Sequence, residues 1–129
     1  MAEERRRRLL RRGSVPLVVH GLLEYGVGVL FIASSSLFSF DSDSATVASV
    51  LIGAIVLAMA GLTDTPTALI RRLPLDSHIV LDYVVSLLAI ASPFALGFSD
   101  DGAALAFFLI VGIFHLLLTA LTRFRRREE

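Results

Sequence analysis

Three residue types that the sequence lacks narrow its chemistry. It contains no cysteine, which excludes disulfides, thiolate metal sites and cysteine nucleophiles. It also contains no tryptophan and no lysine, so all 12 basic residues are arginines. Long polar stretches are scarce as well, since 55% of the residues are hydrophobic and the mean hydropathy is +0.76. A chain of 129 residues with this composition indicates one small domain of the membrane class, not an ordinary soluble protein.

The charged residues are segregated although the net charge is zero. Arginines gather at 5–12, 71–72 and 123–127, and acidic residues at 41–43 and 100–101 lie between those clusters. Each arginine cluster flanks a long apolar run, which follows the positive-inside rule and argues against nucleic acid as a partner. We expect the arginines to contact anionic lipid head groups of the bilayer. The residues concerned are Arg5, Arg6, Arg7, Arg8, Arg11, Arg12, Arg71, Arg72, Arg123 and Arg125.

Four apolar runs are each close to the length that a bilayer-spanning helix needs. They predict helices over Val15–Phe38, Ala45–Leu62, Ile79–Phe98 and Ala103–Leu121. The first run is longer than the apolar core of a signal peptide, so we expect it to be retained in the protein. Ser14 is the expected N-cap of the first helix and Ser44 that of the second.

The second half of the chain repeats the first. At an offset of 58 residues, nine of the 21 positions from His20 to Phe40 are identical in the stretch from His78 to Phe98, and Glu24 aligns with Asp82. Duplication of a two-helix unit accounts for this agreement. Because each unit crosses the membrane twice, both copies enter it in the same orientation, as in parallel repeats.

The predicted fold is therefore an all-α membrane protein of four transmembrane helices. They form two tandem two-helix hairpins in a parallel pseudo-two-fold repeat, with both termini in the cytoplasm. The predicted segments are a cytoplasmic basic segment 1–13, a first transmembrane hairpin 14–65, a cytoplasmic linker 66–77, a second transmembrane hairpin 78–122 and a cytoplasmic tail 123–129.

Five ionisable residues inside the apolar runs are the candidate site. His20 and His78 are each followed four residues later by an acid, Glu24 or Asp82, which places the members of each pair on one helix face. His115 on the fourth helix lies at a similar depth. Acids inside a membrane span are costly and normally face the bundle interior, so we expect the five side chains to converge in a polar cluster near the cytoplasmic side.

Three interpretations of this polar cluster remain open. The side chains can serve only as packing contacts, with each histidine paired to its own carboxylate. They can instead relay protons or ions, or bind a metal ion or haem, because imidazole and carboxylate suit zinc, iron and other first-row metals. The cofactor is therefore a metal ion, a haem or none, and the sequence does not decide among them.

Small residues and one proline mark two further features of the helices. Gly28 on the first helix and Ser86 on the third continue the faces that carry the acids, and this stripe predicts direct contact between those two helices. Ser92-Pro93 removes a backbone donor near the outer end of the third helix. The proline predicts either a kink or an early end of that helix.

The segment 90–98, IASPFALGF, carries a recognisable motif. It follows Asp82 and precedes an acidic turn and a further apolar helix, and in this setting it resembles the SPW repeat of small bacterial membrane proteins. In that family a two-helix unit carries Ser-Pro-Trp, often in tandem. Phe94 stands where the family has Trp, and Ser34-Ser35-Ser36 replaces the motif in the first copy. The resemblance implies a multi-pass protein of the bacterial cytoplasmic (inner) membrane and implies no reaction.

These observations favour a small integral membrane scaffold or accessory subunit with a buried His/carboxylate cluster on the cytoplasmic side. The alternative is a proton-coupled small transporter, or a metal-binding or haem-binding membrane protein, that uses the same cluster. No nucleophile, cofactor loop or catalytic motif is present, so we do not expect an enzyme. A homo-oligomer and a complex with a partner membrane subunit are both compatible with the sequence.

Overall fold

The computed structural model describes residues 1–4 and 13–124. A helical turn at residues 2–4 is followed by four long helices. They are α2 (Leu17–Phe38), α3 (Asp43–Leu62), α4 (Leu75–Ala95) and α5 (Gly102–Leu121). The predicted head-group residues Arg5, Arg6, Arg7, Arg8, Arg11, Arg12 and Arg125 lie outside the described residues.

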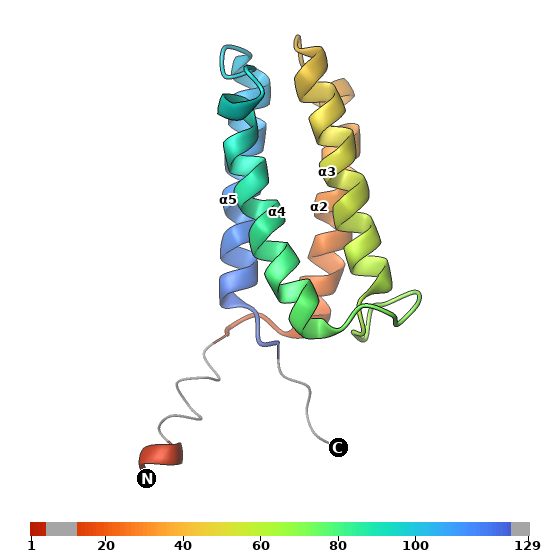
Figure 1. Ribbon diagram of the computed structural model, residues 1–129, viewed down its shortest axis with the longest axis vertical. Coiled ribbons are helices and arrows are strands. Elements are labelled where there is room, and N and C mark those ends of the chain that lie inside the picture. Colours follow the sequence, from red (N-terminus) through yellow and green to blue (C-terminus); the bar gives the residue numbers. More distant parts are fainter. Residues whose placement is uncertain (5–12, 125–129) are drawn as a thin grey trace.

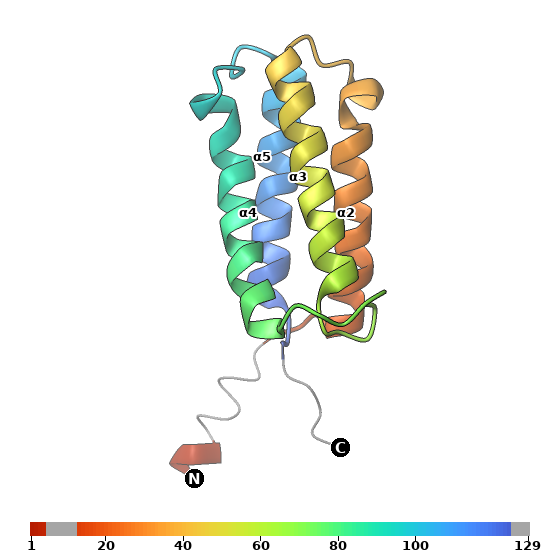
Figure 2. The same ribbon diagram turned by 45° about the vertical axis from the view of Figure 1, so that its right-hand side comes forward.

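The helices form an up-and-down bundle (Figure 1). Turned by 45°, the bundle shows α2 and α4 on opposite sides, with α3 in front and α5 behind (Figure 2). The helices that correspond in the two repeats, α2 with α4 and α3 with α5, thus lie across diagonals. The linker between α3 and α4 lies at the same end as the start of α2 and the end of α5, and we call this the arginine end. The turns at 39–42 and 96–101 form the opposite, acidic end.

Each of the four long helices is long and apolar enough to cross a membrane. Large apolar side chains such as Leu87, Leu88 and Ile110 are more than half exposed on the outside of the bundle. Buried polar residues lie inside, which is the reverse of a soluble bundle. Lipid tails, not water, are the solvent that accommodates such an apolar surface. The chain is a multi-pass membrane protein, as predicted.

Two helix starts differ from the prediction. Pro16, not Ser14, occupies the N-cap of α2, because the backbone of Val15 is already used in hydrogen bonds with Leu121 and Arg123. At the start of α3 the cap is Ser42, whose side chain accepts a hydrogen bond from the Ala45 N–H at 3.2 Å, and Ser44 lies within the first turn. Ser42 has the extended backbone that an N-cap residue needs.

The helix α4 is displaced relative to its predicted range of 79–98. It starts at Leu75 directly after Pro74, whose fixed φ and missing N–H suit the position before a first turn. It ends at Ala95, two residues beyond Pro93, and the left-handed Gly97 leads into the acidic turn. Of the two outcomes predicted for Ser92-Pro93, the structure has the early end. The Ser92 hydroxyl donates to the Leu88 carbonyl at 2.5 Å.

The half of the bundle near the acidic end has an aromatic core. Phe31 and Phe108 are fully buried, and their ring centroids lie 5.5 Å apart in an edge-to-face arrangement. Phe107 lies 5.0 Å from Phe31, and Phe98 lies 4.9 Å from Phe108. These rings come from α2, α5 and the segment after α4, so they join the two hairpins.

The glycines show that close helix contact occurs within each hairpin. A Cβ on Gly53 of α3 would lie 2.7 Å from the Gly28 carbonyl oxygen and 2.6 Å from the Ile32 side chain. In the second repeat, a Cβ on Gly112 would lie 3.0 Å from the Ile90 side chain. Gly28 and Ser86 are both buried inside the bundle, and the atoms nearest to Gly28 belong to α3, so the predicted direct contact between Gly28 and Ser86 stays a prediction.

Candidate metal centre

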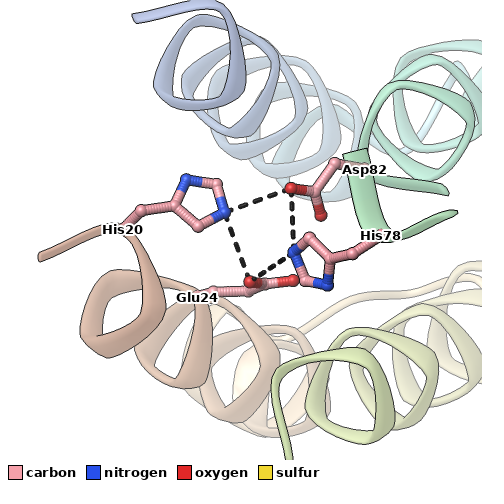
Figure 3. Close-up of side chains that lie close together, drawn as sticks. All are labelled: His20, Glu24, His78 and Asp82. Carbon is pink, nitrogen blue, oxygen red and sulfur yellow. Dashed lines mark ion pairs between the residues drawn. The ribbon is translucent and has the colours of Figure 1, made fainter. Parts of the chain in front are cut away.

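Four side chains from the two diagonal helices meet in the bundle interior near the arginine end. His20 and Glu24 lie one turn apart on α2, and His78 and Asp82 lie one turn apart on α4 (Figure 3). All four are at most 1% exposed. One ligand atom of each lies within 4.8 Å of one ligand atom of every other. We call these four residues the quartet.

The quartet is shared between the repeats. His20 Nε2 lies 3.3 Å from Glu24 Oε2 on its own helix and 3.1 Å from Asp82 Oδ2 on the other repeat. His78 Nε2 lies 3.1 Å from both of these oxygens. The interpretation in which each histidine pairs only with its own carboxylate is therefore wrong.

A threonine holds the other nitrogen of each histidine. His20 Nδ1 lies 2.8 Å from the Thr122 hydroxyl, and His78 Nδ1 lies 2.5 Å from the Thr63 hydroxyl. Each threonine follows the last helix of a hairpin, and each bonds to the histidine of the opposite repeat. The pseudo-two-fold relation therefore includes the contacts around the quartet as well as the helices.

Two short backbone bridges place these threonines. Thr122 pairs with Val15 and Thr63 pairs with Leu73, both in parallel fashion. The Val15 N–H donates to the Leu121 carbonyl at 3.1 Å, and the corresponding Leu73 N–H donates to the Leu62 carbonyl at 2.7 Å. These bridges close the arginine end of the bundle directly beneath the histidines.

The threonine bonds determine which histidine nitrogen carries a proton. The Thr122 hydroxyl donates its one hydrogen to the Leu118 carbonyl at 2.5 Å, and the Thr63 hydroxyl donates to the Met59 carbonyl at 2.5 Å. Each hydroxyl oxygen must then accept from a histidine Nδ1–H. Both Nε2 atoms therefore face the carboxylates, and in a neutral histidine that atom carries a lone pair.

The positions of the four facing atoms suit a central cation. A lone pair on Nε2 directed at carboxylate oxygens 3.1 to 3.3 Å away is repulsive unless a positive charge lies between them. A proton on Nε2 can form a linear hydrogen bond with only one oxygen, yet each Nε2 lies at nearly the same distance from two carboxylate oxygens. His20 Nε2 and both Asp82 oxygens make no hydrogen bond of normal geometry among the described residues. In a tetrahedron with edges of this length the centre lies about 2 Å from each corner, which is the length of a zinc bond to nitrogen or oxygen.

His115 distinguishes the two sides of the quartet. Its Nε2 lies 3.4 Å from Asp82 Oδ1, the oxygen that does not face the centre, and it is 1% exposed. Val56, fully buried on α3, occupies the corresponding place in the first repeat. Glu24 Oε1 makes no hydrogen bond within the described part of the chain. All five predicted side chains thus come together, with His115 outside the quartet.

Sequence reasoning missed Thr63, Thr122 and Phe124. The Phe124 ring lies edge-to-face on His20 with centroids 5.1 Å apart, and Thr65 corresponds to it in the first repeat. The sequence does contain evidence for the two threonines, because each follows the end of an apolar run and they are 59 residues apart, close to the repeat offset of 58. Extending the repeat into the second helix of each unit, with one residue inserted, would have aligned them.

The predicted head-group arginines that the structure describes lie around the arginine end. Arg71 and Arg72 are exposed in the linker, and the Arg71 Nε lies 3.9 Å from Asp64 Oδ1. Arg123 follows Thr122, and its Nε donates to the Gly13 carbonyl.

Comparison with known protein families matches residues 18–122 to the SPW repeat domain. The chain belongs to the SPW repeat family. The match covers both hairpins, including the first copy, in which three serines replace the motif. Comparisons with curated proteins and with solved structures found no match.

Within this SPW repeat protein the motif and the quartet lie at different ends. Ser92 and Pro93 are two to three turns beyond Asp82 along α4, where they end the helix near the acidic turn. The motif thus defines the length of α4, and the quartet is built from the start of the same helix.

Proposed function

We propose that this SPW repeat protein is a small membrane scaffold whose two hairpins are joined by one divalent transition-metal ion. His20, Glu24, His78 and Asp82 are the proposed ligands. The carrying observation is that both Nε2 atoms, with Nδ1–H held by threonines, face the same two carboxylate oxygens at 3.1 to 3.3 Å. Metal-binding histidines commonly donate their other ring N–H to an acceptor in this way.

Charge balance supports a divalent ion. Two carboxylates and two neutral imidazoles carry a charge of −2, so one divalent cation makes the site neutral. Neutrality matters here because a net charge inside a membrane bundle is strongly unfavourable. Two nitrogen and two oxygen donors suit the first-row metals, and four-coordinate donors at this spacing favour zinc.

The closure of the site supports a structural role. All four ligands are almost completely buried, whereas catalytic zinc sites keep a position open to water or substrate. Two helices that lie across a diagonal supply the ligands, so the ion links elements that otherwise have little contact (Figure 2). The proposed role is therefore to hold the repeats together, with the arginine end on the cytoplasmic side as the positive-inside rule predicts.

Two alternatives are less well supported. Against a transporter, the aromatic core of Phe31, Phe107 and Phe108 fills the bundle between the quartet and the acidic end, where a transport pathway would have to run. The buried hydroxyls nearby, Ser34 and Ser86, donate to carbonyls of their own helices and do not form a chain. Against a haem, one carboxylate oxygen of Glu24 and one of Asp82 each lie 3.1 to 3.3 Å from both Nε2 atoms, so they occupy the space between the imidazoles in which a porphyrin would have to lie.

Metal analysis of the purified protein tests this proposal. We expect about one divalent transition-metal ion per chain in protein extracted in mild detergent, measured by inductively coupled plasma mass spectrometry. Replacing both histidines, His20→Ala with His78→Ala, should remove the ion. Retention of helical circular dichroism would show that the fold persists. Wild-type protein that neither contains nor takes up zinc, manganese, iron or cobalt would contradict the proposal.

The threonines provide a more selective test. Thr63→Val and Thr122→Val keep the side-chain shape but remove the acceptor for Nδ1–H, and each should weaken metal affinity about 10-fold to 100-fold. Competition with a chromophoric chelator measures this change. Thr119→Val is the matched control, because the Thr119 hydroxyl donates only to the His115 carbonyl on its own helix. If all three variants bound equally well, the threonines would have no part in the site.

A further inference from the structure

A shallow apolar groove lies at the arginine end, on the outside of the bundle. It is bounded by the last two turns of α3 and by the segment that leads into α4, and its volume is about 400 Å³. The lining residues are Ile55, Ala58, Met59, Leu62, Arg72 and Leu73. Its size falls within the range of small-molecule sites, and every lining residue except the arginine is apolar.

The pseudo-two-fold relation shows what is particular about this groove. The corresponding face of the second repeat has Phe114 where this one has Ile55, and Leu117 where this one has Ala58. Ser14 takes the place of Arg72 there. At these positions the second repeat thus carries larger side chains and a serine in place of the arginine, so the combination of small apolar residues with Arg72 belongs to the first repeat.

Arg72 is held at the rim of the groove by its backbone. Its N–H donates to the Leu62 carbonyl at 3.0 Å, and Leu73 next to it is in the bridge with Thr63. The neighbouring Arg71 lies 3.9 Å from an Asp64 oxygen, whereas none of the ion pairs among the described residues involves Arg72. Arg72 is exposed, so its guanidinium is available to an external anion.

We propose that this groove binds one anionic phospholipid. The acyl chain lies against Ile55, Ala58 and Leu62, and the head-group phosphate pairs with Arg72. Helices embedded in a bilayer place such a groove beside lipid chains, and arginine at the membrane surface attracts anionic head groups. The planar guanidinium forms paired hydrogen bonds with phosphate oxygens. Zwitterionic lipids present the same phosphate, but their choline cation offsets its charge and weakens the attraction of the arginine.

Native mass spectrometry with defined lipids tests the inference. Detergent-solubilised protein is mixed with equal amounts of phosphatidylglycerol and phosphatidylcholine that have the same acyl chains. We expect the wild type to retain one phosphatidylglycerol at least about fivefold more than phosphatidylcholine, the size expected for one arginine near the head group. Arg72→Gln should abolish this preference. Arg71→Gln, the adjacent control, should keep it.

A variant that introduces one side chain of the second repeat into the groove tests the role of the groove itself. Ala58→Leu introduces the residue found at the corresponding position of the other face and leaves Arg72 in place. It should reduce phosphatidylglycerol retention about fivefold without changing the thermal midpoint, because Ala58 is exposed. Undiminished retention in Ala58→Leu, equal effects of the two arginine variants, or equal retention of both lipids by the wild type would each overturn the inference. None of these outcomes depends on whether the quartet holds a metal.

Discussion

The two hairpins of this protein have the same internal contacts and different surroundings. In both, a threonine after the second helix fixes the histidine of the other repeat, and a short parallel bridge fixes that threonine. In both, a glycine of the second helix packs on an isoleucine of the first. The parts that have stayed alike since the duplication are thus those that orient the histidines and bring the helices of a hairpin together.

The differences between the hairpins lie next to these shared contacts. His115 faces Asp82, whereas the corresponding position of the first repeat is the buried Val56. Phe124 covers His20, whereas the corresponding position of the first repeat is Thr65. The two repeats therefore share a pseudo-symmetric backbone but differ in the side chains around the quartet. Variants of matched residues show how much each difference contributes to the stability of the protein.

The largest expected effect on stability is that of neutralising either of the two carboxylates. Asp82 faces three histidines at 3.1 to 3.4 Å, whereas Glu24 faces two. Removing one partner from a buried ionic group typically destabilises a protein by about 3 to 5 kcal/mol. We expect Asp82→Asn to fall in that range and Glu24→Gln to be about 1 kcal/mol less severe, because one histidine fewer is left unpaired. Unfolding in mixed micelles with a chelator present measures both, and equal losses would mean that His115 is energetically irrelevant.

A smaller effect on stability is expected from replacing either of the matched glycines. A Cβ on Gly53 would lie 2.7 Å from the Gly28 carbonyl, a backbone atom that cannot move without shifting α2. A Cβ on Gly112 would meet the Ile90 side chain at 3.0 Å and the Ala89 Cβ at 3.3 Å, where a small rotation relieves the contact. Gly53→Ala should therefore destabilise by about 1 to 3 kcal/mol and Gly112→Ala by less than about 1 kcal/mol. The same unfolding assay compares them, and the reverse order would show that the second hairpin is the more tightly packed.

The smallest expected difference concerns the two N-caps at the acidic end. Burial raises the pKa of Asp101, but hydrogen bonds from the N–H groups of Ser42, Ala104 and Asp41 together outweigh this and hold the pKa below its ordinary value of 3.8. A lowered pKa means that the ionised group stabilises the folded state above the unfolded-state pKa, and that this contribution is lost as the pH falls through the folded-state value. Ser42, the corresponding cap, has no such dependence.

Thermal midpoints between pH 3 and pH 6 test the comparison of the caps. Asp101→Asn should lower the midpoint slightly at pH 6, and its difference from the wild type should shrink as the pH falls. Ser42→Ala should lower the midpoint by a nearly constant amount, since it removes a neutral cap worth about 1 kcal/mol. A difference for Asp101→Asn that stays constant with pH would refute the assigned role of its charge.

The sequence was sufficient to predict the helices, their pairing and the residues of the quartet. Apolar runs of membrane length have to form helices, because a helix satisfies the backbone hydrogen bonds within the bilayer. The arginine clusters at alternate ends of the runs predict the direction in which each helix crosses the membrane. Acids inside such runs have to face inward, which is why Glu24 and Asp82 meet in the interior as expected. The family resemblance, carried by 90–98, was confirmed over residues 18–122.

The sequence did not predict which contacts join the helices or where the helices begin. Gly28 is buried one turn from Glu24, as assigned, but its nearest neighbours belong to α3, because the bundle puts the corresponding helices of the two repeats across a diagonal. Ser14 was predicted as a cap because the pairing of Val15 with Thr122 depends on residues at the far end of the chain. The threonine bonds were missed for the same reason, since they join segments that only the folded bundle brings together.

The exchange of threonines between the repeats affects the order of assembly. His78 bonds to Thr63, which lies only 15 positions earlier and has already been synthesised when the third helix enters the membrane. His20 bonds to Thr122, which lies 102 positions later. His20 and Glu24 therefore have no partner from the second repeat until the third helix supplies His78 and Asp82, and the bond of His20 to Thr122 can form only after the end of the chain emerges. The last helix and the residues just after it thus decide when the interior of this protein becomes complete.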